Sequence, residues 1–126
     1  LLDPASNGAV LPILHVNGYK ISGPTIFARM SNKEITALFT GYGYEPFFVE
    51  GKELHKSMFE TMETCYQRIS DNQTRARKGE NFTTRFPMII MKSPKGWTTV
   101  KEVRGQKIEG TILAHQVVMP TFRGDE

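Results

Sequence analysis

The sequence predicts an α/β chain built on a parallel, doubly wound sheet. Three apolar runs of strand type, at residues 9–16, 45–50 and 87–93, alternate with two segments of helical period. An order of strand, helix, strand, helix, strand, with helices long enough to cross over a sheet, is typical of βαβ units. Ligands of such sheets bind beyond the carboxyl ends of the strands, so we expect the segments "NGYKI" and "PKGWT" to lie at that edge.

The first strand carries apolar residues at Ile13, Leu14 and Val16, the pattern of a strand that is covered on both faces. Pro12 stands early in the run, where a missing backbone donor is best tolerated. Asn17 and Gly18 then end the run with a turn signal. A buried strand that is followed by an amide side chain and a glycine suggests that a functional feature at its carboxyl end requires these two residues.

The first helix is predicted to begin after Ser31, which stands three residues before Glu34 in the spacing of a capping box. Gly41 is placed to end this helix. Its expected apolar face consists of Ile35, Leu38 and Phe39.

The longest helix is predicted to start near Lys52 and to carry one apolar stripe with a 3.6-residue period. We interpret the stripe as core packing, rather than as a methionine-rich binding groove. Cys65 lies on the stripe without an activating neighbour, which predicts an inert buried thiol. The stripe consists of Leu54, Met58, Met62, Cys65 and Ile69, widened by Phe59 and Tyr66.

Composition restricts the class of protein. A chain of 126 residues with 39% hydrophobic and 23% charged residues fits one folded domain and has no apolar run of membrane length. The single cysteine fits a reducing compartment, so cytoplasm is the default location. The net charge of +3 is mild, and its densest basic run, residues 75–79, is typical of a solvated helix end. The first and last residues suggest a piece of a longer chain.

Asn17 is the first candidate for chemistry. Its amide oxygen, with backbone carbonyls freed by the turn, forms half of a site for a hard cation such as Mg²⁺ or Ca²⁺. The alternative is an ordinary Asn-Gly turn, and the local sequence by itself favours that alternative.

Lys95 and His115 are the other candidates. Lys95 follows the third strand and is placed to meet a phosphate as a point charge, unless it merely extends from a surface turn. His115 lies in the apolar segment "AHQVVMP", where histidine binds substrate hydroxyls or moves protons, or else packs structurally beside aliphatic residues.

Three separated stretches together resemble the phosphoketolases, which are thiamine-diphosphate enzymes related to transketolase. They are "NGAVLPILHVNGYKISGPTIFARMS", "GYGYEPFFVEG" and "PMIIMKSPKGWTTVKEVRGQKIEGTILAHQV". The resemblance is weakest across residues 52–84 and after residue 118. It implies that residues 1–126 are a fragment of one domain, the amino-terminal thiamine-diphosphate-binding domain of a transketolase-like fold.

The resemblance also implies a site. Asn17 and the main-chain oxygen of Tyr19 match the family's ligands to a Mg²⁺ (or Ca²⁺) that bridges the cofactor's diphosphate. Gly18 belongs to the same cofactor-binding turn. Lys95 and His115 match residues that line the active site near the cofactor and the sugar phosphate, so both are expected to bind the cofactor and to take part in catalysis.

The implied reaction cleaves xylulose 5-phosphate or fructose 6-phosphate with phosphate, to give acetyl phosphate, a shortened aldose phosphate and water. The implied partners are the remainder of the polypeptide and further copies of it, with no nucleic acid and no membrane. The family's Gly-Asp-Gly element and its activating glutamate are absent from these residues, and Val118 departs from the usual His-Gln-Val-Pro continuation. An isolated fragment is therefore expected to be inactive.

Two alternatives stay open from the sequence. One is a transketolase-like transferase, which belongs to the same superfamily. The other is a non-catalytic basic binding module on an α/β fold, which would bind an oligonucleotide in a salt-sensitive way.

Overall fold

The structure, a computed structural model, describes residues 3–20 and 23–116. The chain divides into two compact units: Leu1–Val16 with Met30–Ser93, and Asn17–Arg29 with Pro94–Glu126. The prediction that residues 1–126 are a fragment of a single domain stays a prediction. No helix in the described ranges combines the length and the apolar character needed to cross a membrane.

The first unit contains a parallel sheet of three strands, β1 (Ile13–Val16), β2 (Tyr44–Val49) and β3 (Phe86–Lys92). Two helices connect the strands, α2 (Asn32–Gly41) between β1 and β2, and α3 (Leu54–Arg77) between β2 and β3. The predicted α/β class with a parallel sheet is confirmed.

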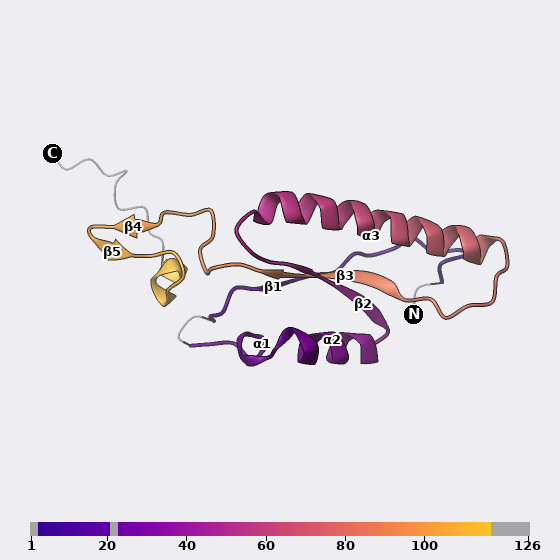
Figure 1. Ribbon diagram of the computed structural model, residues 1–126, viewed down its shortest axis with the longest axis horizontal. Helices are drawn as coiled ribbons and strands as arrows, with labels where there is room; N and C mark the ends of the chain where they lie inside the picture. The colour runs from indigo at the N-terminus through magenta and orange to yellow at the C-terminus, as the bar shows by residue number, and fades with distance from the viewer. Residues whose placement is uncertain (1–2, 21–22, 117–126) are drawn as a thin grey trace. The chain divides into compact units, whose positions relative to one another are not determined.

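The order of the strands, β1-β3-β2, explains why the sheet is covered on both faces. The chain passes over the position of β3 on its way from β1 to β2, and then reverses direction to reach β3. Crossover connections share one hand, so a reversal of direction places the second helix on the opposite face. Figure 1 shows α3 on one side of the sheet and α2 on the other.

β3 is the centre of the core, because it has a strand on each side and a helix over each face. Its residues Pro87–Met91 are all buried, and Ile89 and Ile90 have no exposed surface. The core is completed by Ile35 of α2, Val49 of β2 and Cys65 of α3, which are also fully buried.

β1 is more exposed than the sequence predicts. The side chain of Ile13 is 49% exposed and Leu14 is half-buried, so only Val16 belongs to the core. Within the described residues β1 pairs with β3 alone, which leaves its other edge uncovered. The strand is also shorter than the apolar run of residues 9–16, although the carbonyl of Pro12 still accepts a hydrogen bond from the Ile89 N–H at 2.9 Å.

α2 begins where the sequence predicts. The Ser31 hydroxyl accepts a hydrogen bond from the Glu34 N–H at 3.3 Å, and the Glu34 carboxylate accepts one from the Ser31 N–H at 2.7 Å. The two bonds complete a capping box and satisfy donors at the helix start. The hydrogen bonds from Ser31 also hold the pKa of the Glu34 carboxyl below its usual value.

The stripe on α3 is only partly core. Leu54 and Cys65 are buried, but Phe59 is 67%, Met62 46% and Tyr66 73% exposed. The interpretation of the whole stripe as core packing is therefore wrong. The helix lies over β2 and β3. Phe59 and Tyr66 each follow a stripe position by one residue, which turns their side chains about 100° around the helix from it.

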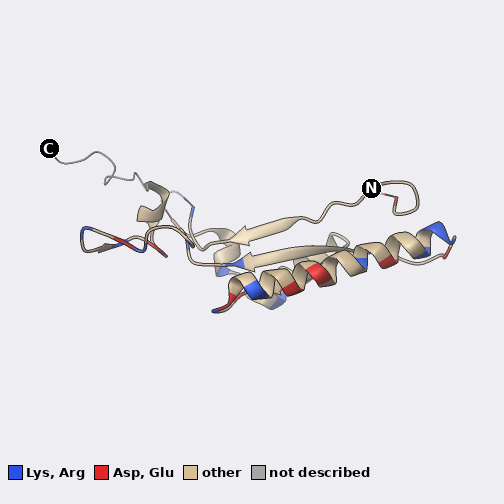
Figure 2. Cartoon of the chain, turned by 90° about the horizontal axis from the view of Figure 1, so that it is seen from above, with Lys and Arg blue, Asp and Glu red and all other residues tan. Residues whose placement is uncertain are grey.

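Acidic and basic residues are interspersed along α3, as the colours of the ribbon in Figure 2 show. The basic run at residues 75–79 lies at the carboxyl end of this helix, as predicted. There the Arg75 guanidinium pairs with the Glu80 carboxylate at 2.6 Å and lies over the Phe82 ring, 3.9 Å from its centroid.

The exposed residues Phe59, Met62 and Tyr66 lead to a prediction about residues 1–126 expressed alone. We expect this piece to be poorly soluble or self-associated, because exposed apolar side chains and the edges of β1 and β2 that lack a partner among the described residues favour contacts with other chains. Sedimentation velocity measures the size distribution. Serine at these three positions is expected to reduce association, whereas a well-behaved monomer with a sharp cooperative melt in the unmodified piece would contradict the prediction.

The second unit contains short elements that the sequence does not predict: α1 (Ile26–Arg29), the hairpin of β4 (Glu102–Val103) and β5 (Gln106–Lys107), and the 3₁₀ helix η1 (Ile112–Gln116). Arg104 and Gly105 connect the two strands of the hairpin with φ of 49° and 78°. Two successive residues with positive φ are the mark of the tight turns that suit the twist of a hairpin.

Candidate functional site

Two of the predicted site segments follow strands that end together. Val16, the last residue of β1, pairs with Lys92, the last residue of β3. The Ser93 N–H also donates a hydrogen bond to the Val16 carbonyl at 3.3 Å. The segments that begin at Asn17 and at Pro94 therefore leave the sheet from the carboxyl ends of neighbouring parallel strands, where ligands of such sheets bind.

The loop after β1 is built on an Asn-Gly turn. The Asn17 side-chain oxygen accepts a hydrogen bond from the Tyr19 N–H at 3.3 Å, which is the geometry of an Asx turn. Gly18 adopts a φ of 87°, which glycine tolerates without strain. The Gly18 carbonyl then accepts a hydrogen bond from the Thr25 N–H at 3.1 Å, and this bond closes the loop.

Lys95 is buried, with only 7% of its surface exposed. Its ammonium group donates a hydrogen bond to the Lys20 carbonyl at 2.7 Å and a longer one to the Tyr19 carbonyl at 3.4 Å. The alternative of a lysine extending from a surface turn is wrong. A buried ammonium needs partners of this kind, because a desolvated charge without hydrogen bonds is costly. Lys95 thus fastens the segment after β3 to the loop after β1.

The turn that carries Lys95 has unusual backbone geometry. Gly96 has a φ of 72°, and Thr98 has a φ of 70°, which is rare for a β-branched residue. The Lys95 carbonyl accepts a hydrogen bond from the Gly110 N–H at 2.6 Å, so the turn is also held to the end of the hairpin segment. Strained backbone of this type concentrates at functional sites.

His115 lies on η1 and is exposed. The aliphatic residues 117–119 of its apolar segment lie outside the described residues, so the expected apolar surround stays a prediction. Its neighbours Ile112 and Leu113 are 48% and 41% exposed, and they do not bury it. η1 nevertheless touches the turn of Lys95, because Ala114 packs directly against the backbone of Gly96. The predicted departure from the family at Val118 lies outside the described residues.

The oxygen atoms of the loop are suited to part of a Mg²⁺ site. The Asn17 oxygen accepts one long hydrogen bond, and the Tyr19 carbonyl has one weak contact, so each keeps capacity for a further ligand. Two neutral oxygens are too few by themselves, and the described residues contain no cluster of three or more His, Cys, Asp or Glu able to hold a metal. Mg²⁺ that binds mainly through phosphate oxygens needs no more than one or two protein ligands.

The first unit has polar groups at its sheet edge that sequence reasoning missed. The His15 Nε2 atom lies 2.6 Å from the Ser93 hydroxyl oxygen. The Lys92 ammonium donates to the Asn32 side-chain oxygen, and the Asn32 amide donates to the Glu50 carboxylate at 3.1 Å. His15 could have been noticed in the sequence as a polar residue inside an apolar strand. The other residues offered only one clue, which is that each stands at or next to the end of a strand or helix.

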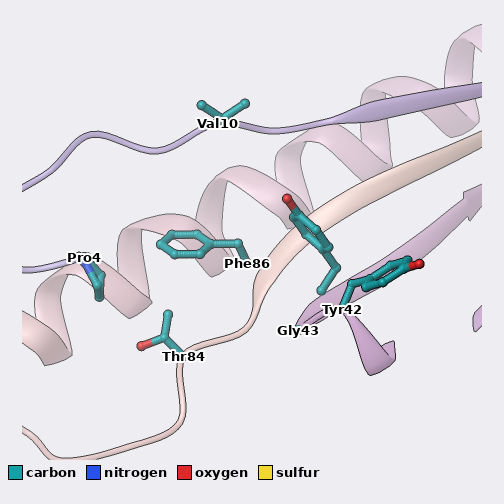
Figure 3. Close-up of a pocket in the computed structure, with 7 residues that line it drawn as sticks. Pro4, Val10, Tyr42, Gly43, Thr84 and Phe86 are labelled. Carbon is teal, nitrogen blue, oxygen red and sulfur yellow. The ribbon is translucent and has the colours of Figure 1, made fainter. Parts of the chain in front are cut away.

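A pocket lies at the opposite end of the sheet, where the strands begin. It has a volume of about 520 Å³ and lies near Tyr44 and Phe86, the first residues of β2 and β3. Figure 3 shows it between Pro4, Val10, Tyr42 and Phe86. None of the predicted site residues lines it, so it does not contribute to the candidate site.

Cys65 is a fully buried residue of α3, as predicted. Burial, and to a smaller extent the nearby Glu45 carboxylate, raises the pKa of its thiol. A raised pKa disfavours the nucleophilic thiolate, in agreement with an inert role.

Fold and site together define a class: parallel α/β chains with polar loops after the carboxyl ends of the strands, the edge at which such sheets bind ligands. The sequence model of one family, the XFP N-terminal domain, matches residues 1–126. The chain therefore belongs to the family of phosphoketolase amino-terminal domains, and its parallel sheet is consistent with a transketolase-like fold.

Curated relatives agree with this family. A protein of Synechococcus elongatus named "Probable phosphoketolase" is 51% identical over 122 residues, which cover 94% of this chain and 15% of the relative. A protein of Brucella suis with the same name is 50% identical over 128 residues, 99% of this chain and 16% of the relative. "Probable phosphoketolase 2" of Rhizobium meliloti is 52% identical over 120 residues, 92% of this chain and 15% of the relative. The chain thus spans about one sixth or less of the length of these relatives.

Proposed function

We propose that this chain is part of a thiamine-diphosphate-dependent phosphoketolase, a carbon–carbon lyase. The substrates would be xylulose 5-phosphate or fructose 6-phosphate with inorganic phosphate, and the products acetyl phosphate, an aldose phosphate and water. Membership of the family supports the proposal. The observation that carries it is the pair of hydrogen bonds from Lys95 to the loop of Asn17 and Tyr19, because they join two predicted site segments.

In this proposal the loop after β1 holds the metal. The Asn17 side-chain oxygen and the Tyr19 carbonyl would bind Mg²⁺, and Gly18 would let the backbone turn both oxygens toward it. This assignment explains why a strand of the sheet ends on Asn-Gly-Tyr. The remaining ligands would come from the cofactor's diphosphate and from the rest of the polypeptide.

Lys95 would attract a phosphate group of the cofactor or the substrate. Its charge is held within hydrogen-bonding distance of the Lys20 and Tyr19 carbonyls, so a phosphate bound at this loop would lie near a fixed positive charge. Two carbonyl partners leave the ammonium capacity for a third hydrogen bond.

His115 would act on the substrate. Its imidazole is exposed, and can therefore accept or donate hydrogen bonds to the hydroxyl groups of a sugar phosphate. A histidine so placed would hold or move a proton as charge develops at the breaking carbon–carbon bond. Thiamine diphosphate, when bound, supplies the carbanion chemistry of the cleavage.

The location and the assembly of the parent are part of the same proposal. We expect a cytoplasmic enzyme that forms a dimer or a larger homo-oligomer and binds neither nucleic acid nor membrane. The mixture of acidic and basic residues along α3 supports the expectation about nucleic acid for this helix, because surfaces that bind nucleic acid gather basic residues on one face.

The test is an assay of the full-length parent with xylulose 5-phosphate, inorganic phosphate, Mg²⁺ and thiamine diphosphate. We expect acetyl phosphate to form, and its formation to stop when phosphate or the cofactor is left out. The matched control replaces phosphate with an aldose phosphate acceptor. Transfer of the two-carbon unit to that acceptor, without acetyl phosphate in the first reaction, would contradict a phosphoketolase and identify a transketolase-like transferase.

A further inference from the structure

Gly96 lies against η1 so closely that no side chain fits at its position. A Cβ atom added to Gly96 would lie 2.6 Å from the Ala114 Cβ and 3.0 Å from the Thr99 hydroxyl oxygen. Real Cβ atoms essentially never show contacts under 3.0 Å, so one of the two segments would have to shift. Ala114 contributes the smallest side chain that an amino acid other than glycine can have.

The turn of Gly96 is the fixed side of this contact. Lys95 is tied through its ammonium to the Lys20 carbonyl at 2.7 Å, and through its own carbonyl to the Gly110 N–H at 2.6 Å. The Thr99 N–H also donates to the Gly96 carbonyl at 3.0 Å. Moving the turn would break several hydrogen bonds, including those of a buried ammonium.

η1 is the side that can give way. It is a short 3₁₀ helix, and 3₁₀ helices have poorer hydrogen-bond geometry than α-helices. Its start is held by two long hydrogen bonds of 3.3 Å, from the Ala114 N–H to the Thr111 carbonyl and from the Leu113 N–H to the Thr111 hydroxyl. A push on Ala114 would therefore move the backbone of η1, and with it the next residue, His115.

We propose that Gly96 is a positioning residue, which sets the place of His115 through its direct contact with Ala114. The inference rests on the proposed role of His115 in the reaction. It assigns to the glycine of "PKGW" a task separate from that of Lys95: Lys95 fastens the turn to the loop after β1, and Gly96 allows η1 to pack closely on that turn.

The chain offers a matched control for the conformational strain of a side chain at Gly96. Gly105 has a φ of 78°, close to the 72° of Gly96, but nothing lies within 4 Å of a Cβ added there. Alanine therefore suffers similar backbone strain at both positions and a clash only at residue 96.

The experiment compares Gly96→Ala and Gly105→Ala in the full-length parent. For Gly96→Ala we expect kcat to fall on the order of 10- to 100-fold, because small misplacements of a reacting group cost this much. The calorimetric affinity for the cofactor with Mg²⁺ should stay within about twofold, and the KM for the sugar phosphate should change less than kcat, because His115 is assigned to the substrate hydroxyls and most strongly to the charge that develops in the transition state. Gly105→Ala should keep wild-type kcat.

Two further variants test the path through Ala114 and His115. Adding Ala114→Gly to Gly96→Ala removes the clashing Cβ atom and should recover most of the lost kcat. In a His115→Ala background, Gly96→Ala should cause no additional loss, because the residue that it displaces is already gone. If Gly96→Ala fails to fold, Ala114→Val enlarges the same contact without a side chain at positive φ and should show the same fall in kcat.

The outcomes separate this inference from the proposed function. A strong loss in His115→Ala, combined with wild-type kcat in Gly96→Ala or in Ala114→Val, would overturn the inference and leave the role of His115 intact. An additive loss in the double variant of Gly96 and His115 would overturn it as well. Wild-type kcat in His115→Ala would instead remove His115 from the reaction, and the inference with it.

Discussion

Replacing His115 with alanine in the full-length parent is expected to lower turnover about 10²–10⁴-fold, the range typical of a positioned acid–base group. Affinity for Mg²⁺ and thiamine diphosphate should change far less, because the exposed imidazole is assigned to the substrate hydroxyls and the developing charge. Steady-state kinetics give kcat, and calorimetry gives the cofactor affinity, so the two effects are measured separately.

His55 provides a matched control for this variant. It is also an exposed histidine, and it lies at the start of α3, outside the candidate site. His55→Ala should therefore keep wild-type turnover. If turnover of His115→Ala stays within about threefold of wild type, well below that range for an acid–base group, His115 has only a structural role.

Replacing Asn17 with alanine is expected to weaken binding of thiamine diphosphate with Mg²⁺ severely. The variant loses a coordinating oxygen, and it also loses the 3.3 Å hydrogen bond that holds the Asx turn. We expect a fall in affinity at least as large as the ~10–100-fold that follows loss of a residue which merely orients a ligand. Calorimetry of the full-length parent measures this affinity directly.

Asn17→Asp is the conservative control for this variant. An aspartate keeps an oxygen for the metal and an acceptor for the Tyr19 N–H, so it should bind the cofactor much better than alanine does. A second measurement is the melting temperature, which should rise on addition of the cofactor with Mg²⁺ in the wild type and in Asn17→Asp, but hardly in Asn17→Ala. Unchanged cofactor affinity in Asn17→Ala would remove Asn17 from the site.

The regular parts of the fold were predictable because local signals specify them. The capping box of Ser31 and Glu34 fixes the start of α2, and the unbroken apolar run of β3 reflects its burial on both faces. The exposure of Phe59, Met62 and Tyr66 was not predictable, because helical period indicates which residues share a face, but does not reveal how wide a surface the sheet beneath provides.

The sequence predicted which segments form the candidate site, but not how their side chains contact one another. Asn17 and Lys95 could be placed after strands, and their residue types suit a cation and a phosphate. The burial of Lys95 and its bonds to the Tyr19 and Lys20 carbonyls depend on how two loops distant in sequence fold together, which no local pattern specifies. The contact between Gly96 and Ala114 was not predictable either. A glycine in a turn usually reflects the backbone conformation alone, so the sequence does not indicate a close neighbour.

The position of β3 between β1 and β2 also affects how the chain folds during its synthesis. β1 and β2 leave the ribosome before β3, and within the described residues each of them pairs with β3 alone, so neither has this partner until residues 86–92 have emerged. Ile13 must wait for Ile89, a non-local pairing of the kind that makes folding slow. Until then the strand edges that β3 covers stay open, and nascent chains that stop before Phe86 should be more prone to aggregation than chains that include β3.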